Sequence, residues 1–225
     1  MKRGKNYRKD EEGYEKGNTY GIDEALGIME KFSKAKFDEA VEVHVKLGVD
    51  PKKSDQQVRG SVVLPNGTGK DVKVVAFTES QEAEAKKAGA EKIGEEKLIE
   101  EIAESGQIDF DVAVASPEMM PKLAKIAKIL GPRGLMPSAK NQTVGPKLEE
   151  IIESLKKGKV NFKNDDSSNL HQVIGRRSFE SKKLEENYEA FKTELMKNKP
   201  PALKGKYIQG ISISSTMSPS IKVTL

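Results

Sequence analysis

The side chains that most often carry catalysis are sparse in this sequence of 225 residues. There is no cysteine, which excludes a thiol nucleophile, a disulfide scaffold and thiolate metal sites. The two histidines, His44 and His171, lie far apart and have no companion motif, so neither a zinc site nor a Ser-His-Asp triad is indicated. We therefore expect a protein that is not an enzyme and that uses no metal or cofactor.

Two short stretches resemble ligand-binding motifs only in part. The sequence GTGK at residues 67–70 looks like the end of a phosphate-binding loop, but Leu64 stands where the first glycine belongs and Asp71 where Ser or Thr belongs. The pair Asp165-Asp166 could bind Mg²⁺, yet the Asn and Ser residues around it favour a hairpin loop. No G-x-G-x-x-G follows a predicted strand, so a dinucleotide site is unsupported.

Three other stretches carry residue types that contact RNA. Residues 34–39 (KAKFDE) place a phenylalanine beside two lysines, which suits stacking on a base while the amines meet phosphates. Residues 171–178 (HQVIGRRS) hold Arg176 and Arg177, whose guanidinium groups can make forked contacts to phosphate. Residues 212–220 hold five Ser and one Thr, whose small hydroxyls can bond ribose 2′-hydroxyls. The structural alternatives are a core phenylalanine, solvated charges and an ordinary polar edge strand.

A fourth stretch, residues 130–140 (LGPRGLMPSAK), combines glycines and prolines with cations and large apolar side chains. We expect an ordered loop, because glycine permits close approach and proline lowers the entropy lost on ordering. Such a loop could contact an anionic backbone. Alternatively, Leu135 and Met136 could cover a core, which the acidic surroundings favour.

Charge is unevenly distributed, although its net value is only +4. Residues 68–158 are net −2, whereas residues 1–67 and 159–225 together are net +6 and hold ten of the twelve aromatic side chains. Basic charge combined with aromatics is typical of RNA-binding surfaces. The chain is 33% charged and 36% hydrophobic, which predicts thin cores, and no apolar run is long enough to span a membrane.

The hydrophobic pattern predicts how these stretches are positioned. In residues 68–158, strands at 72–77 and 110–115 alternate with helices at 79–88, 95–104, 116–130 and 144–157, which predicts a small parallel sheet covered on both faces. The chain ends predict helices at 22–34 and 180–198, and strands at 41–47, 58–64, 159–163, 170–174, 206–214 and 219–224. The first ~17 residues are so charged that we expect partial mobility.

Neither chain end has enough apolar residues for a core of its own. We therefore expect residues 1–67 and 159–225 to form one α+β domain, with residues 68–158 inserted as a second, α/β domain. The two crossings fall at glycines and predict a hinge at Gly67, Thr68, Gly69 and Gly158.

Three longer motifs carry a specific family resemblance. HVKLGVDPKKSDQQVRGSVVLPNGTGK, LGPRGLMPSAKNQTVG and SSTMSPS closely resemble the bacterial type of the large-subunit ribosomal protein number one family, found in the mobile stalk beside the tRNA exit site. The resemblance covers nearly the whole chain. It implies a split β-α-β-like α+β domain built from both chain ends and an inserted Rossmann-like three-layer α/β domain without a nucleotide.

The resemblance also implies site residues. By motif, the family's rRNA contacts fall on Lys36, Phe37, Glu42, His171, Gly175, Arg176, Ser178, Ser214, Thr216, Met217 and Ser218. Two positions depart from the family pattern. Ser218 replaces a glycine, which would cost ~1 kcal/mol or more if the position needs a positive φ or close approach of the backbone. Ala40 replaces a frequent threonine, which would remove a hydroxyl contact.

The function implied is that of a cytoplasmic structural constituent of the large ribosomal subunit. Such a protein binds the rRNA of the stalk, assists release of deacylated tRNA from the exit site, and represses translation of its own operon mRNA. We also expect a monomer off the ribosome, without a membrane partner, and a tRNA contact at the basic residues Lys52, Lys53 and Arg59. The alternative is a nucleotide-binding enzyme that uses the inserted α/β domain.

Overall fold

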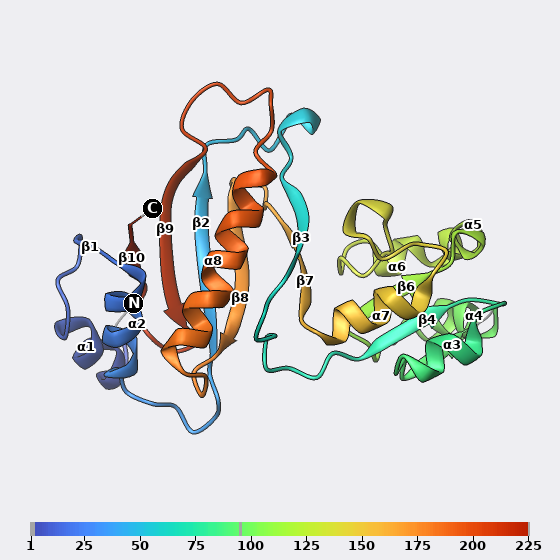
Figure 1. The fold of residues 1–225 in the computed structure, drawn as a ribbon, viewed down its shortest axis with the longest axis horizontal. Coiled ribbons are helices and arrows are strands. Elements are labelled where there is room, and N and C mark those ends of the chain that lie inside the picture. Colours follow the sequence, from blue (N-terminus) through green and yellow to red (C-terminus); the bar gives the residue numbers. More distant parts are fainter. Residues whose placement is uncertain (1–2, 95, 225) are drawn as a thin grey trace. The chain divides into compact units, whose positions relative to one another are not determined.

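The two ends of the chain build one five-stranded sheet. The computed structural model, which describes residues 3–94 and 96–224, arranges its strands in the order β1 (Thr19–Tyr20), β10 (Ile221–Val223), β9 (Ile208–Ser215), β2 (Ala40–Leu47) and β8 (Asn169–Arg176) (Figure 1). β1 runs parallel to β10, and the other neighbouring pairs are antiparallel. The interior strand β2 therefore pairs with two strands from the distant C-terminal third of the sequence.

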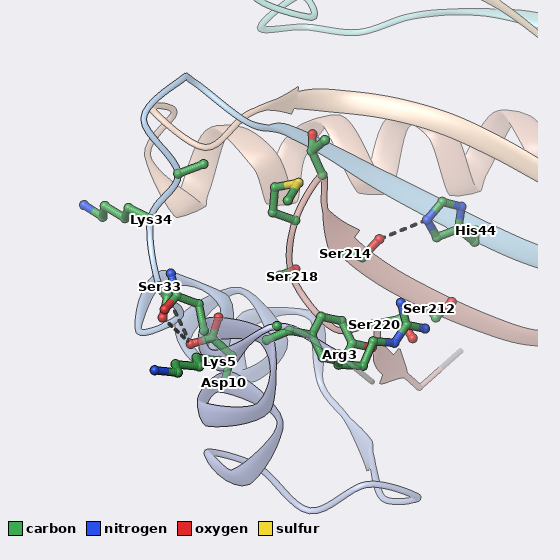
Figure 2. A pocket seen from close by; sticks show the side chains of 16 residues that line it. Arg3, Lys5, Asp10, Ser33, Lys34, His44, Ser212, Ser214, Ser218 and Ser220 are labelled. Atoms are coloured by element: carbon green, nitrogen blue, oxygen red, sulfur yellow. Dashed lines mark hydrogen bonds between the residues drawn. The ribbon is translucent and has the colours of Figure 1, made fainter. Parts of the chain in front are cut away.

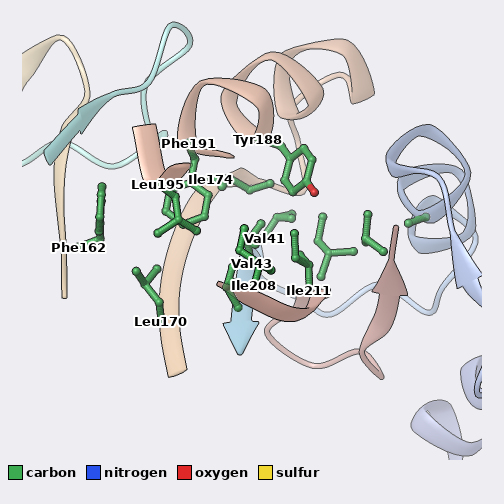
Figure 3. Close-up of a cluster of buried hydrophobic side chains, with 14 of the residues drawn as sticks. Val41, Val43, Phe162, Leu170, Ile174, Tyr188, Phe191, Leu195, Ile208 and Ile211 are labelled. Carbon is green, nitrogen blue, oxygen red and sulfur yellow. The ribbon is translucent and has the colours of Figure 1, made fainter. Parts of the chain in front are cut away.

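One face of this sheet is apolar and is covered by α2 (Ile22–Glu30) and α8 (Ser181–Lys197). Successive side chains of a strand point to opposite faces, and the alternating valines of β2 are buried against these helices. In α8, a buried stripe repeats every three or four residues and faces the sheet: Leu184, Tyr188, Phe191 and Leu195 (Figure 3). Each fully buried side chain of this size contributes roughly 1.5–3 kcal/mol.

The N-terminal segment forms a helix that the sequence pattern did not predict. Residues 5–12 make α1 (Lys5–Glu12), whose mean hydropathy is low because most of its side chains are charged. Aromatic contacts just beyond it fix the segment. The Tyr14 ring lies 5.8 Å from that of Phe32 and 6.5 Å from that of Tyr20, and its hydroxyl donates to Ser220 O at 3.0 Å. The segment that was expected to be partly mobile is thus packed against the rest of the first unit.

A two-stranded sheet, β3 (Arg59–Val63) with β7 (Lys159–Lys163), lies beside α8. The connection from β7 to β8 is a tight turn, because Asp165 Oδ1 accepts bonds from Ser167 N at 2.9 Å and Asn169 N at 2.6 Å. The predicted hairpin is wrong, since β7 pairs with β3 and β8 pairs with β2. Asp165 thereby closes its own turn. Within the described residues, no group of three or more metal-binding side chains is assembled.

Residues 70–159 form a second unit around a parallel three-stranded sheet of order β5 (Lys92–Gly94), β4 (Val74–Phe77), β6 (Val112–Ala115). The strand β5 was not predicted, since only three residues pair. One apolar cluster on this sheet is completed by α3 (Glu82–Lys87) and α7 (Leu148–Lys156), and a second by α4 (Glu96–Ser105) and the segment that follows β6.

The predicted helix over 116–130 is confirmed in extent, since residues 117–130 are helical without a gap, but it is not one regular α-helix. The segment is divided into η2 (Pro117–Met119), α5 (Met120–Leu123), η3 (Ala124–Ile126) and α6 (Ala127–Leu130), with another turn, η4 (Ala139–Asn141), farther on. Pro121 has no N–H to donate, so the α-helical hydrogen bond to the residue four positions earlier is missing here, although Met120 keeps helical angles (φ −57°, ψ −42°). In the loop that follows, Leu135 and Met136 pack on the core, as the structural alternative predicts.

The mixed α/β class is confirmed. The contacts group residues 1–69 with 160–225 in the first unit, close to the boundaries expected from the sequence. That the two units are separate domains of split β-α-β-like and Rossmann-like type, joined by a hinge, stays a prediction. None of the helices in the described part of the chain is long and apolar enough to cross a membrane.

A buried ion pair holds one end of the first unit together. Glu39 is 1% exposed, and its Oε1 lies 2.9 Å from Arg177 Nη1. The same guanidinium donates to the carbonyls of Met29, Phe32 and Ser33 at the end of α2, at 2.5–3.0 Å. Glu39 also accepts bonds from Ser215 Oγ, Ala35 N and Met217 N. Four chain segments therefore meet at one charged pair.

Replacing Arg177 should destabilise the first unit strongly. Arg177→Met leaves a buried carboxylate and several helix-end carbonyls without their donor, which should cost about 3–5 kcal/mol of unfolding free energy. Arg177→Lys should lose less, since it keeps the charge but not the fork of donors. Urea unfolding followed by tyrosine fluorescence measures this, because all five tyrosines lie in the first unit and tryptophan is absent from the sequence. Arg59→Met, at an exposed position, is the matched control and should stay within about 0.5 kcal/mol.

The same pair should make stability depend on pH. Burial raises the pKa of Glu39, but the bonds from Ser215, Ala35, Met217 and Arg177 outweigh it, so that its pKa lies below 4.5. The stabilisation from Glu39 is therefore present above pH 4.5 and is lost as the pH falls through the lowered pKa. We expect Glu39→Gln to be less stable than the parent at pH 7, with the difference shrinking below pH 4.5. A difference that stays constant down to pH 3 would contradict this assignment.

Candidate nucleic-acid interface

The polar face of the large sheet collects side chains from three strands. In the pairing register, His44 of β2 lies opposite His171 of β8 and Ser212 of β9, while the next outward position, Glu42, lies opposite Ser214. His44 Nδ1 is 2.7 Å from His171 Nδ1, and His44 Nε2 is 3.0 Å from Ser214 Oγ (Figure 2). The result is a continuous polar row across the middle of the sheet.

His44 is held in its neutral form. Burial lowers its pKa, the neighbouring His171 lowers it further, and Glu42 acts in the opposite direction. At neutral pH the His44 imidazole is therefore a hydrogen-bonding group and not a cation. His171 is exposed, and its Nε2 lies 3.7 Å from Asp165 Oδ2. His44 was not predicted as a site residue, because only the strand register brings it to His171.

Two exposed apolar side chains project from the loops at one end of this row. Phe37 is 54% exposed and Met217 is 61% exposed, although residues of this size are usually buried. The loops beneath them are fixed by two bonds between Ala40 and Thr216. The Ala40 N–H donates to the Thr216 hydroxyl, Oγ1, at 3.1 Å, and the Ala40 carbonyl accepts from Thr216 N at 3.1 Å. Lys36, next to Phe37, is exposed. The structural alternative of a core Phe37 is wrong.

The substitution at Ser218 carries no backbone strain. The only non-glycine residues with positive φ in the described ranges are Gln142 and Ser168, so Ser218 does not occupy the left-handed region. Its hydroxyl accepts a bond from Ser215 N at 2.9 Å and stabilises the turn. The cost of a positive φ therefore does not arise, whereas a cost from close approach of the backbone to RNA stays a prediction.

The stretch 175–178 is divided between support and surface. Arg177 is wrong as a phosphate ligand, because its guanidinium is buried in the ion pair with Glu39. Ser178 is exposed but is bonded through both its N–H and its hydroxyl to the Asp38 carboxylate, at 3.1 and 2.8 Å. Arg176 is half-buried and donates to Asp38 O at 3.3 Å. Gly175 is buried where a Cβ would come within 2.7 Å of Leu184, so it shapes the strand end and not the surface chemistry.

The residues proposed for tRNA lie elsewhere. Lys52, Lys53 and Arg59 are exposed on the β2–β3 connection and at the start of β3. Eight strand residues of β2, roughly 25 Å, separate this region from the loops of Phe37 and Met217. The structure therefore does not bring the two groups together.

The predicted hinge glycines have the conformations that favour glycine. φ is +65° at Gly67, +70° at Gly69 and +100° at Gly158. Gly67 is tied to the first unit, since the buried Asn187 donates to its carbonyl at 2.9 Å, and a Cβ at Gly69 would meet Arg176 at 2.7 Å. Thr68 lies half-buried between them. Hinge motion at these residues stays a prediction.

The second unit offers a poor phosphate site at the ends of its strands. A cavity of about 740 Å³ beside the carboxyl end of β4 and the start of β5 is lined by Glu79, Glu82 and Glu91 and by one cation, Lys86, so its net negative charge repels phosphate. The neighbouring Gln81 is already bonded within the protein: its N–H donates to Thr78 Oγ1, and its Oε1 accepts a bond from Leu148 N. The nucleotide-binding alternative thus gains no support from this edge.

Comparison with known proteins identifies the family. The model of the Ribosomal protein L1p/L10e family matches residues 29–219. A Kosmotoga olearia protein named "Large ribosomal subunit protein uL1" is 46% identical over 223 residues, which cover 99% of this chain and 96% of that protein. Proteins of the same name from Cutibacterium acnes and Mycoplasma capricolum are each 45% identical, over 99% and 93% of this chain and 96% and 92% of their own lengths.

These matches extend over nearly the whole chain, and they agree with the resemblance that the three sequence motifs carry. Coverage of almost the full length of each relative shows that both units belong to the matched protein. The chain is therefore a member of the Ribosomal protein L1p/L10e family, a family of ribosomal proteins and not of enzymes.

Proposed function

We propose that this chain is a structural constituent of the large ribosomal subunit and that the polar face of its five-stranded sheet binds large-subunit rRNA. The observation that carries the proposal is the exposure of Phe37 and Met217 at the end of the polar row formed by β2, β8 and β9. Two large apolar side chains held in solvent by buried hydrogen bonds are typical of a surface that meets a partner.

The chemistry of this face suits RNA. Exposed bases stack on aromatic and thioether side chains, while serine, threonine and imidazole groups bond ribose hydroxyls and base edges. The predicted contacts His171, Ser214, Thr216 and Ser218 are such groups, Glu42 offers a carboxylate that accepts bonds from ribose hydroxyls or base amines, and Lys36 and Arg176 add positive charge. The excess of six positive charges on the chain ends supports attraction to phosphate.

The mechanism we infer is recognition of RNA shape by a preformed surface. The Phe37 loop and the 216–218 turn are already bonded to Glu39 and Ala40, so little conformational entropy is lost when RNA binds. Any RNA with the same local shape fits the same face. This supports the further proposal that the chain binds its own operon mRNA and represses its translation, since rRNA and mRNA then compete for one site.

Contact with deacylated tRNA is assigned to the exposed cations Lys52, Lys53 and Arg59. Their separation from the Phe37 loop permits rRNA and tRNA to be bound at the same time, which assisted release from the exit site requires.

Removing either exposed apolar side chain should weaken rRNA binding without unfolding the protein. We expect Phe37→Ala and Met217→Ala each to lose ~1–3 kcal/mol of affinity for a large-subunit rRNA stalk fragment, because a stacking contact is lost. Met196→Ala is a matched control, since Met196 is 51% exposed on α8, and its affinity should equal that of the parent. Unchanged affinity in both Phe37→Ala and Met217→Ala, with unfolding midpoints preserved, would remove this face from the proposal.

Reversing the charges of the tRNA region should separate the two activities. The triple variant Lys52→Glu, Lys53→Glu and Arg59→Glu should bind the rRNA fragment within about threefold of the parent, because charges this far from the rRNA face are screened at ~0.15 M salt. Reconstituted ribosomes that carry the variant should release exit-site tRNA more slowly. Lys182→Glu, Lys183→Glu and Lys197→Glu on α8 control for net charge, and an equal slowing by this second triple variant would refute the assignment.

A further inference from the structure

We propose that helix α1 forms one wall of an RNA-binding groove, in which Arg3 and Lys5 contact the sugar-phosphate backbone of the RNA that occupies the sheet face. The inference rests on the proposed function and extends it to a segment outside the residues that the family motifs indicate. The observations are a hollow in the surface, the fixation of α1 beside it, and the charge on its rim.

The groove is a hollow of about 910 Å³ between α1 and the polar face of the sheet (Figure 2). Its floor consists of hydroxyl groups of β9 and the following turn together with the imidazole of His44. Met217 and Thr216, both predicted rRNA contacts, line it as well. The groove is therefore continuous with the proposed interface and is not a separate cavity.

The wall is held in place by two anchors. Asp10, the buried residue of α1, accepts bonds at its Oδ1 from Ser33 N at 2.9 Å and from Ser33 Oγ at 2.8 Å. Tyr14, two residues beyond the helix end, donates to Ser220 O at 3.0 Å. Ser33 immediately precedes the Lys34–Phe37 loop, and Ser220 follows the 216–218 turn. The helix is thus fixed to the same two loops that carry Phe37 and Met217.

The rim of the groove is positively charged. Arg3, Lys5 and Lys34 are exposed, and none of them forms an ion pair with any residue that the structure describes. The Arg3 guanidinium lies over the Tyr7 ring, 4.7 Å from its centroid, which orients it beside β9 (Figure 2). Asp10 is the one carboxylate in the lining of the hollow, and it is already occupied by Ser33.

Hydroxyls on the floor and cations on the rim match the two hydrogen-bonding parts of an RNA backbone. Phosphate oxygens accept bonds from arginine and lysine, and ribose 2′-hydroxyls exchange bonds with Ser and Thr. The groove lies between α1 on one side and the sheet face with the adjoining loops on the other. It therefore has this wall only while α1 is docked. We assign its occupant as one strand of the rRNA that also contacts Phe37.

The charge on α1 allows a matched test, because Arg8 and Lys9 are also exposed on this helix but do not line the hollow. We would measure binding of a large-subunit rRNA stalk fragment to the full chain across a range of KCl concentrations. The variant Arg3→Gln with Lys5→Gln should bind about tenfold more weakly near 0.15 M salt, with a log–log salt slope reduced by about two. Arg8→Gln with Lys9→Gln has the same net charge and should stay within about threefold of the parent, with an unchanged slope.

A third variant tests the anchoring of the wall. Asp10→Ala removes a negative charge, so attraction between net charges alone would strengthen RNA binding, whereas loss of the docked helix should weaken it by about fivefold or more. Added to the Arg3→Gln, Lys5→Gln background, Asp10→Ala should have little further effect, because both changes disable the same contact.

The outcomes separate this inference from the proposed function. Three results would overturn the groove and leave the sheet face intact. They are equal weakening by the two double variants, tighter binding by Asp10→Ala, and unchanged binding by Arg3→Gln with Lys5→Gln while Phe37→Ala still weakens it. If neither Phe37→Ala nor the Arg3, Lys5 variant weakens binding, the proposed function fails as well. Weakening by the Arg3, Lys5 variant and by Asp10→Ala, but not by the control, supports the groove.

Discussion

The ion pair between Glu39 and Arg177 is the constraint on which the binding surface depends. It lies inside the protein, yet the bonds it makes reach the end of α2, the loop before β2, the end of β8 and the turn after β9. Two charges removed from water are costly unless every neighbouring donor and acceptor is used. Here most are used: the carbonyls at the end of α2 satisfy Arg177, and the partners of Glu39 include backbone N–H groups of the loops that present Phe37 and Met217.

This arrangement explains how apolar side chains remain exposed. A flexible loop would fold Phe37 or Met217 back onto the nearest apolar surface, because burial of each side chain is favourable by roughly 1.5–3 kcal/mol. The loops cannot do so without breaking the bonds to Glu39 and Ala40. The stability of the first unit and its readiness to bind are therefore two consequences of the same buried contacts.

The same logic extends to α1. Its side chains are mostly charged, and it would not be stable as an isolated helix, since a helix of eight residues is marginal in water. The hydrogen bonds of Asp10 to Ser33 and the ring contacts of Tyr14 supply the stabilisation that the helix lacks on its own.

Much of the fold could be predicted from the sequence, and the reason is local. The alternation of β2, the helical stripe of α8 and the turn formers around Asp165 depend on periodicity and backbone chemistry within a few residues, and the structure has these elements close to their predicted bounds. Composition also located the basic, aromatic-rich chain ends, and motif resemblance indicated the family. The helix over 116–130 was missed in detail because Pro121 acts against an otherwise helical pattern.

Tertiary structure alone decided which charged and polar residues are surface and which are support. Arg176 and Arg177 are adjacent and chemically equal in the sequence, but the strand end leaves one partly exposed and buries the other against Glu39. His44 and His171 are 127 positions apart and meet only through the pairing of β2 with β8. Contacts of this kind depend on strand register and on the burial of partners distant in the chain, so local pattern carries no signal for them.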